Sequence, residues 1–445
     1  MARSPERCEE IRSTLRELAA VVVEASRLEP RVSEALRGWR PGRPLILVAI
    51  GKGAPAMARG AIEALGAPDG GVVATIRGVD VSGLEGVEVV YGEHPVPGEG
   101  SLRAGEAVLE WAREAGSSGG SLLALVSGGG SAIVEAPLDG LTIEDIAEAT
   151  KALLASGATI DEINAVRKHL SRIKGGRLAE ASRPARVLGL YASDVPGDRL
   201  DSIASGPTVP DPTTYGEALR VIDLYGLRGR IPRRVVEVLE AGARGELPET
   251  PKPGSPVFEG VENRLAASNM DVLESMAEWL GSRGYRVLVL TSRLEGESRE
   301  AARVLASIAL EAMDRGVPLE PPAAILAGGE TTVTVRGHGV GGRNQELALA
   351  WAWRMSYWGA SCEAGLLAMD TDGIDGVTDA AGAIVVPEDA SRARAMGLDP
   401  LSYLADNDSY TLLSRLGALI KTGPTGSNLN SVVALIVSSK RGGSG

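Results

Sequence analysis

The sequence predicts an α/β fold that is divided into two domains. The chain has 445 residues, a length typical of two to three domains. Apolar runs with the length of buried strands alternate with helical patterns, and glycines stand at the junctions, as in α/β proteins. A proline-rich stretch typical of a linker interrupts this alternation. We therefore expect an N-terminal domain over 1–245, a linker over 246–257 and a smaller C-terminal α/β domain over 258–445.

The first strand and the turn after it indicate a Rossmann-like N-terminal domain. The apolar run 45–50 leads into Gly51-Lys52-Gly53 and then into a helical pattern, which gives the spacing G-x-G-x-x-A. The next predicted strand ends at Arg77, whereas a nicotinamide-binding fold places an acidic residue there. Lys52, one of only seven lysines, can hold a phosphoryl group as a point charge. The alternative for Lys52 is a solvated lysine in a surface turn.

A second glycine loop follows the apolar run 122–126. Its residues are Ser127, Gly128, Gly129, Gly130 and Ser131. Consecutive glycines at the carboxyl end of a strand expose backbone N–H groups, which favour an anion. The loop has neither the Walker A spacing nor that of a nucleophile elbow. We favour ligand binding here over a plain turn.

An acidic residue and a basic helix complete the candidates of the N-terminal half. Asp194 comes directly after the strand 187–192, within a proline–glycine loop, a position that suits a general base or a metal ligand. A helix or turn cap is the alternative for Asp194. Arg167 and Lys168 lie on a predicted helix, where they either line an anionic cleft or form a solvated basic face.

In the C-terminal half, a glycine loop over 337–342 delivers Arg343 to the start of a helix. Free N–H groups at a helix N-terminus and a guanidinium both suit phosphate or carboxylate. Asn344 and Gln345 follow, and Gln345 is the single glutamine in the chain. Proteins of thermophiles contain few Asn and Gln side chains, because these amides are thermolabile. We therefore expect the few that this chain contains to have a role, and Asn344 is a predicted binding residue.

Two further loops of this half carry candidate ligands. Three carboxylates, those of Asp370, Asp372 and Asp375, come after the predicted strand 366–369. Of these, Asp372 and Asp375 are the predicted Mg²⁺ ligands. The alternative is a cluster of Asx turns. A small-residue loop near the end of the chain contains Thr422 and Asn428, which we expect to bind substrate or nucleotide.

Composition excludes several classes of protein. The net charge of −12 counts against a nucleic-acid binder, because such proteins show a basic face. Two cysteines without a C-x-x-C spacing predict neither a disulfide framework nor a zinc site. No signal-peptide pattern and no uncharged apolar run of membrane-spanning length is found. We expect a cytoplasmic protein from a hot environment, with no membrane or nucleic-acid partner, as a monomer or a homodimer.

The motifs, taken together and in order, resemble the class II glycerate kinases. The N-terminal domain of that family is matched by Gly51-Lys52-Gly53-Ala54, Val126-Ser127-Gly128-Gly129-Gly130-Ser131-Ala132, Ser193-Asp194-Val195-Pro196-Gly197-Asp198 and Ser205-Gly206-Pro207-Thr208. Its C-terminal MOFRL domain is matched by Gly341-Gly342-Arg343-Asn344-Gln345-Glu346, Thr371-Asp372-Gly373-Ile374-Asp375-Gly376 and Thr422-Gly423-Pro424-Thr425-Gly426-Ser427-Asn428. The resemblance spans roughly 10–440.

The resemblance implies transfer of the ATP γ-phosphoryl group to D-glycerate, giving 2-phosphoglycerate, in a cleft between the two domains. The proposed catalytic residues of the family match Lys52, Asp194 and Arg343. Phosphoryl transfer depends mostly on positioning and charge neutralisation, and the candidate residues fit that requirement. ATP and Mg²⁺ are the expected cofactors. The predicted binding residues are Gly51, Gly53, Ser127, Gly128, Gly129, Gly130, Ser131, Lys168, Asn344, Thr422 and Asn428.

Two other functions compete with this interpretation. The first is a hydroxypyruvate reductase-type NAD(P)-dependent oxidoreductase, which the turn after the first strand favours and the missing acidic residue opposes. The second is a non-catalytic binding module for a phosphorylated metabolite. In that case Asp194 and the carboxylates of 370–375 would have no role.

Overall fold

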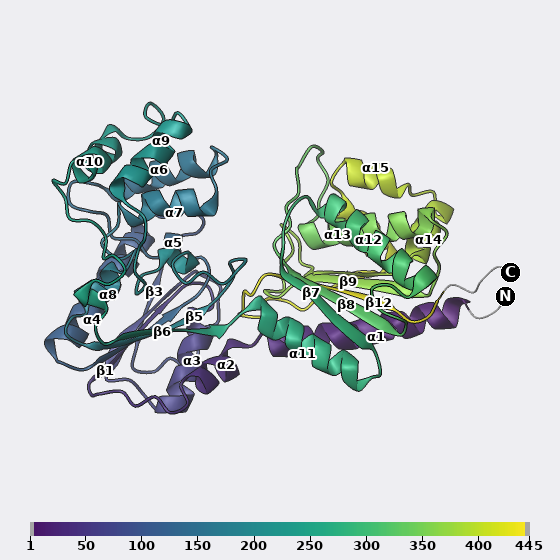
Figure 1. Ribbon diagram of the computed structural model, residues 1–445, viewed down its shortest axis with the longest axis horizontal. Coiled ribbons are helices and arrows are strands. Elements are labelled where there is room, and N and C mark those ends of the chain that lie inside the picture. The colour runs from purple at the N-terminus through teal and green to yellow at the C-terminus, as the bar shows by residue number, and fades with distance from the viewer. Residues whose placement is uncertain (1–3, 441–445) are drawn as a thin grey trace. The chain divides into compact units, whose positions relative to one another are not determined.

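A computed structural model describes residues 4–440, and these form two compact units, each with its own six-stranded sheet (Figure 1). The first, which we call the parallel-sheet unit, comprises Leu28–Ala267. The second, the mixed-sheet unit, combines the chain up to Arg27 with the chain from Ser268 onward. The predicted α/β class and the presence of two α/β domains are confirmed.

Every strand pair of the parallel-sheet unit is parallel, and the strand order is β3-β2-β1-β4-β5-β6. This is the order of a Rossmann-like sheet, so that prediction is confirmed. The order reverses between β1 and β4, and ligands of such sheets bind beyond the carboxyl ends of the strands at that point. The strands are β1 (Leu45–Ile50), β2 (Gly70–Thr75), β3 (Glu88–Tyr91), β4 (Ser121–Val126), β5 (Arg186–Ala192) and β6 (Val261–Ala267).

Helices cover both faces of this sheet, with α3 on one face and α4 on the other (Figure 1). All of β1 is therefore buried, as expected for a central parallel strand. Ile46, Val48 and Ile50 share a core with the apolar face of α4. The helices are α2 (Leu28–Ala35), α3 (Ala54–Leu65), α4 (Glu99–Ser117), α5 (Gly130–Ile133), α6 (Ile143–Leu154), α7 (Ile160–Lys168), α8 (Arg177–Ala181), α9 (Tyr215–Leu224) and α10 (Arg233–Ala243), with 3₁₀ turns η1 (Ile203–Ser205) and η2 (Pro256–Phe258).

The mixed-sheet unit has the strand order β11-β10-β9-β12-β8-β7. Only the β7–β8 pair is parallel among its described pairs. In consequence the carboxyl ends of β8 and β9 lie beside the start of β12, which runs in the opposite direction. The strands are β7 (Arg286–Leu294), β8 (Ala323–Gly329), β9 (Ala364–Asp370), β10 (Gly382–Val385), β11 (Leu419–Ile420) and β12 (Ser431–Val437).

Within this unit, α12 and α13 pack on one face of the sheet, and α1 and α11 lie on the other (Figure 1). The helices are α1 (Ser4–Ala25), α11 (Asn269–Ser282), α12 (Ser298–Arg315), α13 (Arg343–Tyr357), α14 (Glu388–Ala395), α15 (Pro400–Ala405) and α16 (Ser409–Leu416). None of the helices in the described part of the chain has the length and apolar composition of a membrane span.

The helix at the N-terminal end corrects the predicted N-terminal domain. We expected residues 1–245 to fold together, but α1 belongs to the mixed-sheet unit. Its buried side chains include Ile11 and Leu15, and a Cβ at Gly365 of β9 would collide with Ile11. Cys8 and Cys362 form a disulfide, with Cα atoms 4.8 Å apart, a single cross-link that the sequence did not predict. Amphipathic periodicity predicted the helix but not the sheet that it covers.

The segment 246–257 is also not a linker in the structure, because it packs within the parallel-sheet unit. Glu249 accepts hydrogen bonds from His169 Nε2 at 3.0 Å and from the Tyr215 N–H at 3.0 Å. Thr250 Oγ1 donates to Asp211 Oδ2 at 2.8 Å. The chain then adds β6 to the same sheet before it leaves the unit after Ala267. The prolines belong to a surface segment that packs against the rest of its unit. Composition alone does not distinguish such a segment from a linker between domains.

The disulfide yields a stability prediction, because it joins residues 354 positions apart in the sequence. A cross-link over a long loop removes conformational freedom from the unfolded chain, typically stabilising by about 2–4 kcal/mol. We expect a reductant to lower the melting temperature of the oxidised protein. The double variant Cys8→Ser/Cys362→Ser should melt at that lower temperature with or without reductant. Equal melting temperatures for all samples would contradict a stabilising role.

A second prediction concerns Glu249 and pH. Burial opposes ionisation, but hydrogen bonds from His169, the Tyr215 N–H and Lys252 outweigh it and lower the pKa from 4.5 to about 2. Because the folded-state pKa lies below the unfolded value, the stabilisation is present above pH 4.5 and is lost as the pH falls toward 2. In urea unfolding, the stability difference between wild type and Glu249→Gln should shrink over that window. The exposed neighbour Glu259→Gln is the control, and a pH-independent difference would exclude this role for Glu249.

Candidate active site

The turns after β1 and β4 are hydrogen-bonded to each other at the reversal point of the parallel sheet. The Lys52 N–H donates to Gly128 O at 2.9 Å, and the Gly53 N–H donates to Ser127 Oγ at 3.0 Å. Gly51 has a φ of 117°, and a Cβ there would collide with Ser127 O. The Ser127 hydroxyl, a predicted ligand-binding group, therefore fixes the two turns together. Glycine at 51 is required both by its φ and by this close approach.

The glycines of the 127–131 loop bring three candidate side chains close to one stretch of backbone. A Cβ at Gly128 would collide with the carboxylate of Asp194. A Cβ at Gly129, which has a φ of 79°, would lie 3.3 Å from Lys52 Cγ and 3.2 Å from His94 Cδ2. The structure therefore places Lys52, Asp194 and the loop together, and their role as a ligand site stays a prediction. His94 joins them from the loop after β3.

A hydrogen-bonded chain connects the far end of this loop to α7. Ser131 Oγ and Ser205 Oγ are 2.8 Å apart, and Ser205 Oγ donates to Asn164 Oδ1 at 2.9 Å. Ser205 and the preceding Ala204 have φ values of 58° and 48°. Left-handed backbone at residues other than glycine costs about 1–3 kcal/mol and persists where the surroundings impose it, often at functional sites. The predicted Ser131 thus lies against a strained segment that the sequence did not reveal.

Positive charge gathers beside the loop. Desolvation of the His94 imidazole lowers its pKa to about 4, and the nearby charges of Lys52 and Arg167 add to this effect. Burial also lowers the pKa of the Arg167 guanidinium, which the charge of Glu135 partly offsets. The ammonium of Lys174, in contrast, is paired with Glu135 at 2.5 Å in the interior. His94 is consequently neutral at physiological pH, and the cations beside the loop are Lys52 and Arg167.

Lys168, which we predicted to bind substrate or nucleotide, is instead part of a closed ion-pair network. Its ammonium lies 3.3 Å from Asp211 and 3.4 Å from Asp201, and only 2 % of the residue is exposed. Two carboxylates satisfy its charge, so the structure assigns it to packing between α7 and the loops around it. Helical spacing showed Lys168 and Arg167 side by side, but only the fold shows that they point into different surroundings.

In the mixed-sheet unit, Arg343 is held by acidic and polar groups at the ends of three strands. Its guanidinium contacts Glu330 after β8 and Asp370 at the end of β9, each at 2.5 Å. Its Nε–H donates to Ser431 Oγ at the start of β12, at 3.1 Å. These carboxylates raise the pKa of Arg343 against the effect of its burial. Arg343 remains 23 % exposed and is therefore accessible to a ligand.

Asp375, a predicted Mg²⁺ ligand, caps the start of α13. Its two carboxylate oxygens accept hydrogen bonds from the Asn344 N–H at 3.1 Å and the Gln345 N–H at 2.9 Å. The N-cap residue Gly342 has no side chain, and a Cβ there would collide with the Asp375 carboxylate. Asp375 is fully buried and both of its carboxylate oxygens accept hydrogen bonds, so the structure gives it a capping role and its role as a metal ligand stays a prediction. Asn344 shares the capping role, since its Nδ2 donates to Asp375 Oδ1 and to Ser431 Oγ.

Asp370 is the better candidate for a metal-binding carboxylate. It is 3 % exposed, and its Oδ1 is buried without a hydrogen-bond partner in the described structure. Burial raises its pKa to about 7, with Asp372 and Asp375 adding to the effect and Arg343 opposing it. Asp372 is half-buried, and its Oδ1 accepts the Ile374 N–H at 2.8 Å. Asp370 and Asp372 fit Mg²⁺, which takes few protein ligands and completes its shell with phosphate oxygens and water.

The remaining predicted residues, Thr422 and Asn428, lie on the loop before β12. Thr422 is exposed, and its hydroxyl donates to Gly423 O at 2.8 Å, while Asn428 Oδ1 accepts the Asn430 N–H at 3.3 Å. Thr425 Oγ1 donates to Thr371 O at 2.6 Å and so fixes this loop beside the end of β9. The structure brings the loop near the carboxylates but leaves its ligand contacts as a prediction.

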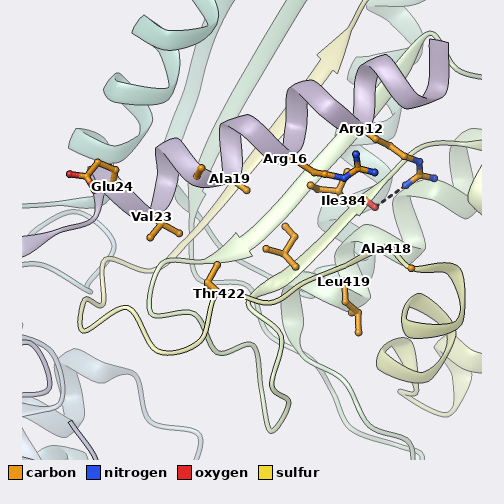
Figure 2. A pocket seen from close by; sticks show the side chains of 12 residues that line it. Arg12, Arg16, Ala19, Val23, Glu24, Ile384, Ala418, Leu419 and Thr422 are labelled. Atoms are coloured by element: carbon orange, nitrogen blue, oxygen red, sulfur yellow. Dashed lines mark hydrogen bonds between the residues drawn. The ribbon is translucent and has the colours of Figure 1, made fainter. Parts of the chain in front are cut away.

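Thr422 also lines a cavity of about 420 Å³ between α1 and the β10–β11 edge (Figure 2). Its walls are mainly apolar, with Ala19 and Leu419 among them, and Arg12 and Arg16 lie at one end. Arg12 is already occupied, since it contacts Asp389 at 2.5 Å and the Ile384 carbonyl at 3.4 Å. No other residue of the predicted site lines this cavity, so we do not include it in the active site.

Four residues of these sites were not singled out as site residues by the sequence. Glu330 and Asp370 follow or end a buried strand, and that position had already drawn attention to Asp194. Applied consistently, the same signal would have found both. Ser431 carries no comparable signal, because its role depends on a side chain that is distant in the sequence. Ser205 belongs to one of the motifs that resemble the family, but its contact with Ser131 could not be predicted from the sequence.

Two family models match the chain. One, described as a domain of unknown function (DUF4147), matches residues 13–240, and the MOFRL family model matches residues 323–431. The first covers the loops around Lys52 and Asp194, and the second covers Arg343 and the carboxylates of 370–375. The fold and its two sites therefore define a protein in which these two domains are joined.

Relatives of similar length carry the same arrangement. D-glycerate 2-kinase of Thermotoga maritima is 45% identical over 397 residues, which is 88% of this chain and 91% of the relative. A protein of Agrobacterium vitis named putative hydroxypyruvate reductase is 44% identical over 405 residues, 89% of this chain and 88% of the relative. The crystal structure of the Thermotoga maritima glycerate kinase matches with a TM-score of 0.87 and 41% identity, over 96% of this chain and 100% of that one. The chain belongs to the glycerate kinase family.

The capping role of Asp375 gives a stability prediction. Asp375→Ala removes the acceptor of two backbone N–H groups at the start of α13, and loss of a helix N-cap typically costs about 1–2 kcal/mol. Asp375→Asn keeps one carbonyl oxygen and should lose less. Denaturant unfolding of both variants measures this order. If Asp375→Ala unfolds at the wild-type denaturant concentration, the carboxylate is not a structural cap and its assignment as a metal ligand returns.

Proposed function

We propose that this chain transfers the γ-phosphoryl group of ATP to the C2 hydroxyl of D-glycerate, giving 2-phosphoglycerate. The observation that carries the proposal is the placement of Lys52 and Asp194 against Gly128 and Gly129 at the reversal point of the parallel sheet. A carboxylate, a cation and exposed backbone N–H groups at that edge are what phosphoryl transfer to an alcohol needs. Membership in the glycerate kinase family supports the choice of acceptor.

Each residue has a role that follows from its surroundings. Asp194 accepts or orients the proton of the attacking hydroxyl, because a half-buried carboxylate beside a glycine loop leaves room for a small substrate. Lys52 supplies a cation for the glycerate carboxylate or the transferring phosphoryl group, and Arg343 is the cation that the mixed-sheet unit offers to such an oxyanion. The Ser127 and Gly130 N–H groups already donate to Ile50 O and Ser127 O, so the N–H groups of Gly128 and Gly129 are the further donors that we assign to an anion.

Mg²⁺ is the expected partner of the nucleotide, and Asp370 and Asp372 are the residues that would hold it. The ion would supply charge neutralisation at the phosphate oxygens. The chain orients the Asp370 carboxylate, because Ser431 Oγ and Arg343 contact its Oδ2 atom at 3.4 Å and 2.5 Å. The other oxygen, Oδ1, is left for a cation. Asp375 stays outside the set because its oxygens cap α13.

The oxidoreductase alternative is not retained. A nicotinamide site of this fold would place an acidic residue after β2, whereas β2 ends at Thr75 and is followed by Ile76 and Arg77. The turn after β1 carries Lys52 beside His94, a cationic surrounding suited to a phosphoryl or carboxylate group. The reductase name of one relative is therefore not extended to this chain.

The test is a turnover assay at elevated temperature with D-glycerate, ATP and Mg²⁺, with the product identified by phosphorus and carbon NMR. Wild type should form 2-phosphoglycerate. Asp194→Asn removes the proton acceptor without changing the shape of the side chain, and we expect a kcat about 100- to 10,000-fold lower with unchanged folding.

Asp198→Asn, in the same loop, is the matched control and should keep most of the activity. Formation of 3-phosphoglycerate would show that the C2 hydroxyl is not the group activated by Asp194, but the assignment as a kinase would stand. No phosphorylated product from folded wild-type protein would refute the proposal. Full activity of Asp194→Asn would remove this carboxylate from the mechanism.

A further inference from the structure

Arg167 is a cation whose charge is not used within the described structure. Across residues 4–440, no hydrogen bond and no ion pair within 4.0 Å occupies its guanidinium. The Glu135 carboxylate acts on the Arg167 charge from a distance, but it is paired with Lys174. Arg167 is neither fully buried nor fully exposed. A guanidinium in this state has five donors to offer to a ligand.

The fold holds Arg167 in a defined place rather than at a mobile surface. It lies on α7, which starts with a capping box between Thr159 and Glu162. Asn164, one turn earlier on the same helix, accepts a hydrogen bond from Ser205 and donates to Ser202 O at 3.3 Å. Ser205 in turn contacts Ser131 of the glycine loop. This chain of hydrogen bonds ties the helix that carries Arg167 to the predicted anion-binding loop.

The surroundings of Arg167 are those of an anion site. Lys52 and Arg167 both act on the imidazole of His94, which lies against Gly129 of the glycine loop. The Lys174–Glu135 pair is internally neutral, and the two cations Lys52 and Arg167 outnumber the one carboxylate of the described residues, Asp194, that lies against the loop. An oxyanion bound beside the loop would be attracted by both cations. Lys168, the neighbouring cation on α7, cannot do this because Asp201 and Asp211 already neutralise it.

We propose that Arg167 binds an oxyanion of the reactants, a carboxylate or a phosphoryl group, next to the 127–131 loop, and that it works together with Lys52. The inference rests on the proposed function in naming the reactants. It extends that function by assigning a ligand-binding residue to α7. A guanidinium can bind two oxygens of one carboxylate or phosphate, so it fixes the orientation of the group as well as its charge.

The experiment compares steady-state kinetics of wild type, Arg167→Ala and Arg167→Lys with D-glycerate and ATP. Loss of a charge-assisted contact should change KM or kcat about 10- to 100-fold in Arg167→Ala. A higher KM for D-glycerate alone identifies the carboxylate as the partner. A lower kcat or a higher KM for ATP identifies a phosphoryl group. Arg167→Lys should recover part of the loss, because it restores the charge without the two-oxygen geometry.

Arg220→Ala, on the exposed face of α9 in the same unit, is the matched control and should behave as wild type. The inference is overturned if Arg167→Ala keeps both KM values and kcat within twofold of an active wild type, or if it changes thermal stability alone. If Arg167→Ala does not fold, Arg167→Lys and Arg167→Gln provide the same comparison.

Failure of the proposed function is recognised separately, as absence of turnover in folded wild type. In that case calorimetric titration with inorganic phosphate still decides on Arg167. Weaker phosphate binding by Arg167→Ala than by wild type and Arg220→Ala supports the inference. Equal binding by all three refutes it.

Discussion

The close approach of two backbone turns is the constraint on which the parallel-sheet site depends. The turns after β1 and β4 share hydrogen bonds through the Lys52 N–H and the Ser127 hydroxyl, and Gly51 leaves no room for a side chain between them. Adjacent parallel strands place these turns side by side at the reversal of strand order. Because glycines line the contact, Lys52 and Asp194 reach the same stretch of loop. The proposed phosphoryl transfer therefore depends on how these two side chains are placed rather than on one reactive group.

The chain uses its few lysines and many arginines in two distinct ways. Lys168 and Lys174 are enclosed with carboxylates, and these buried pairs specify how helices and loops pack. Lys52 and Arg167 lie beside the glycine loop without such partners in the described structure, and there the charge is available to a ligand. Arg343 combines both situations, since Glu330 and Asp370 hold it while part of its side chain stays accessible. Whether a residue is lysine or arginine does not tell an enclosed cation from an available one. The distance to the nearest carboxylate does.

The mixed-sheet unit gains its first helix from the opposite end of the sequence. α1 packs beneath β9, where Gly365 allows close contact, and the Cys8–Cys362 disulfide fixes it there. The same strand ends in Asp370, so the core that receives α1 also positions the carboxylate that contacts Arg343. Burial of Asp370 explains its raised pKa and the unpartnered oxygen that suits a cation. The packing of α1 on one face of this sheet therefore helps to position the Asp370 carboxylate at the end of β9.

The sequence by itself determined the α/β class, the Rossmann-like sheet and the loops that carry Lys52, Asp194 and Arg343. It could do so because strand length, glycine turns and helix starts are local patterns. The domain boundaries, the disulfide and the partners of Lys168 and Asp375 were decided only by the tertiary structure. Each of these depends on contacts between residues far apart in the chain. A buried carboxylate that caps a helix and one that faces a ligand look alike in sequence, because burial and hydrogen-bond partners are properties of the fold.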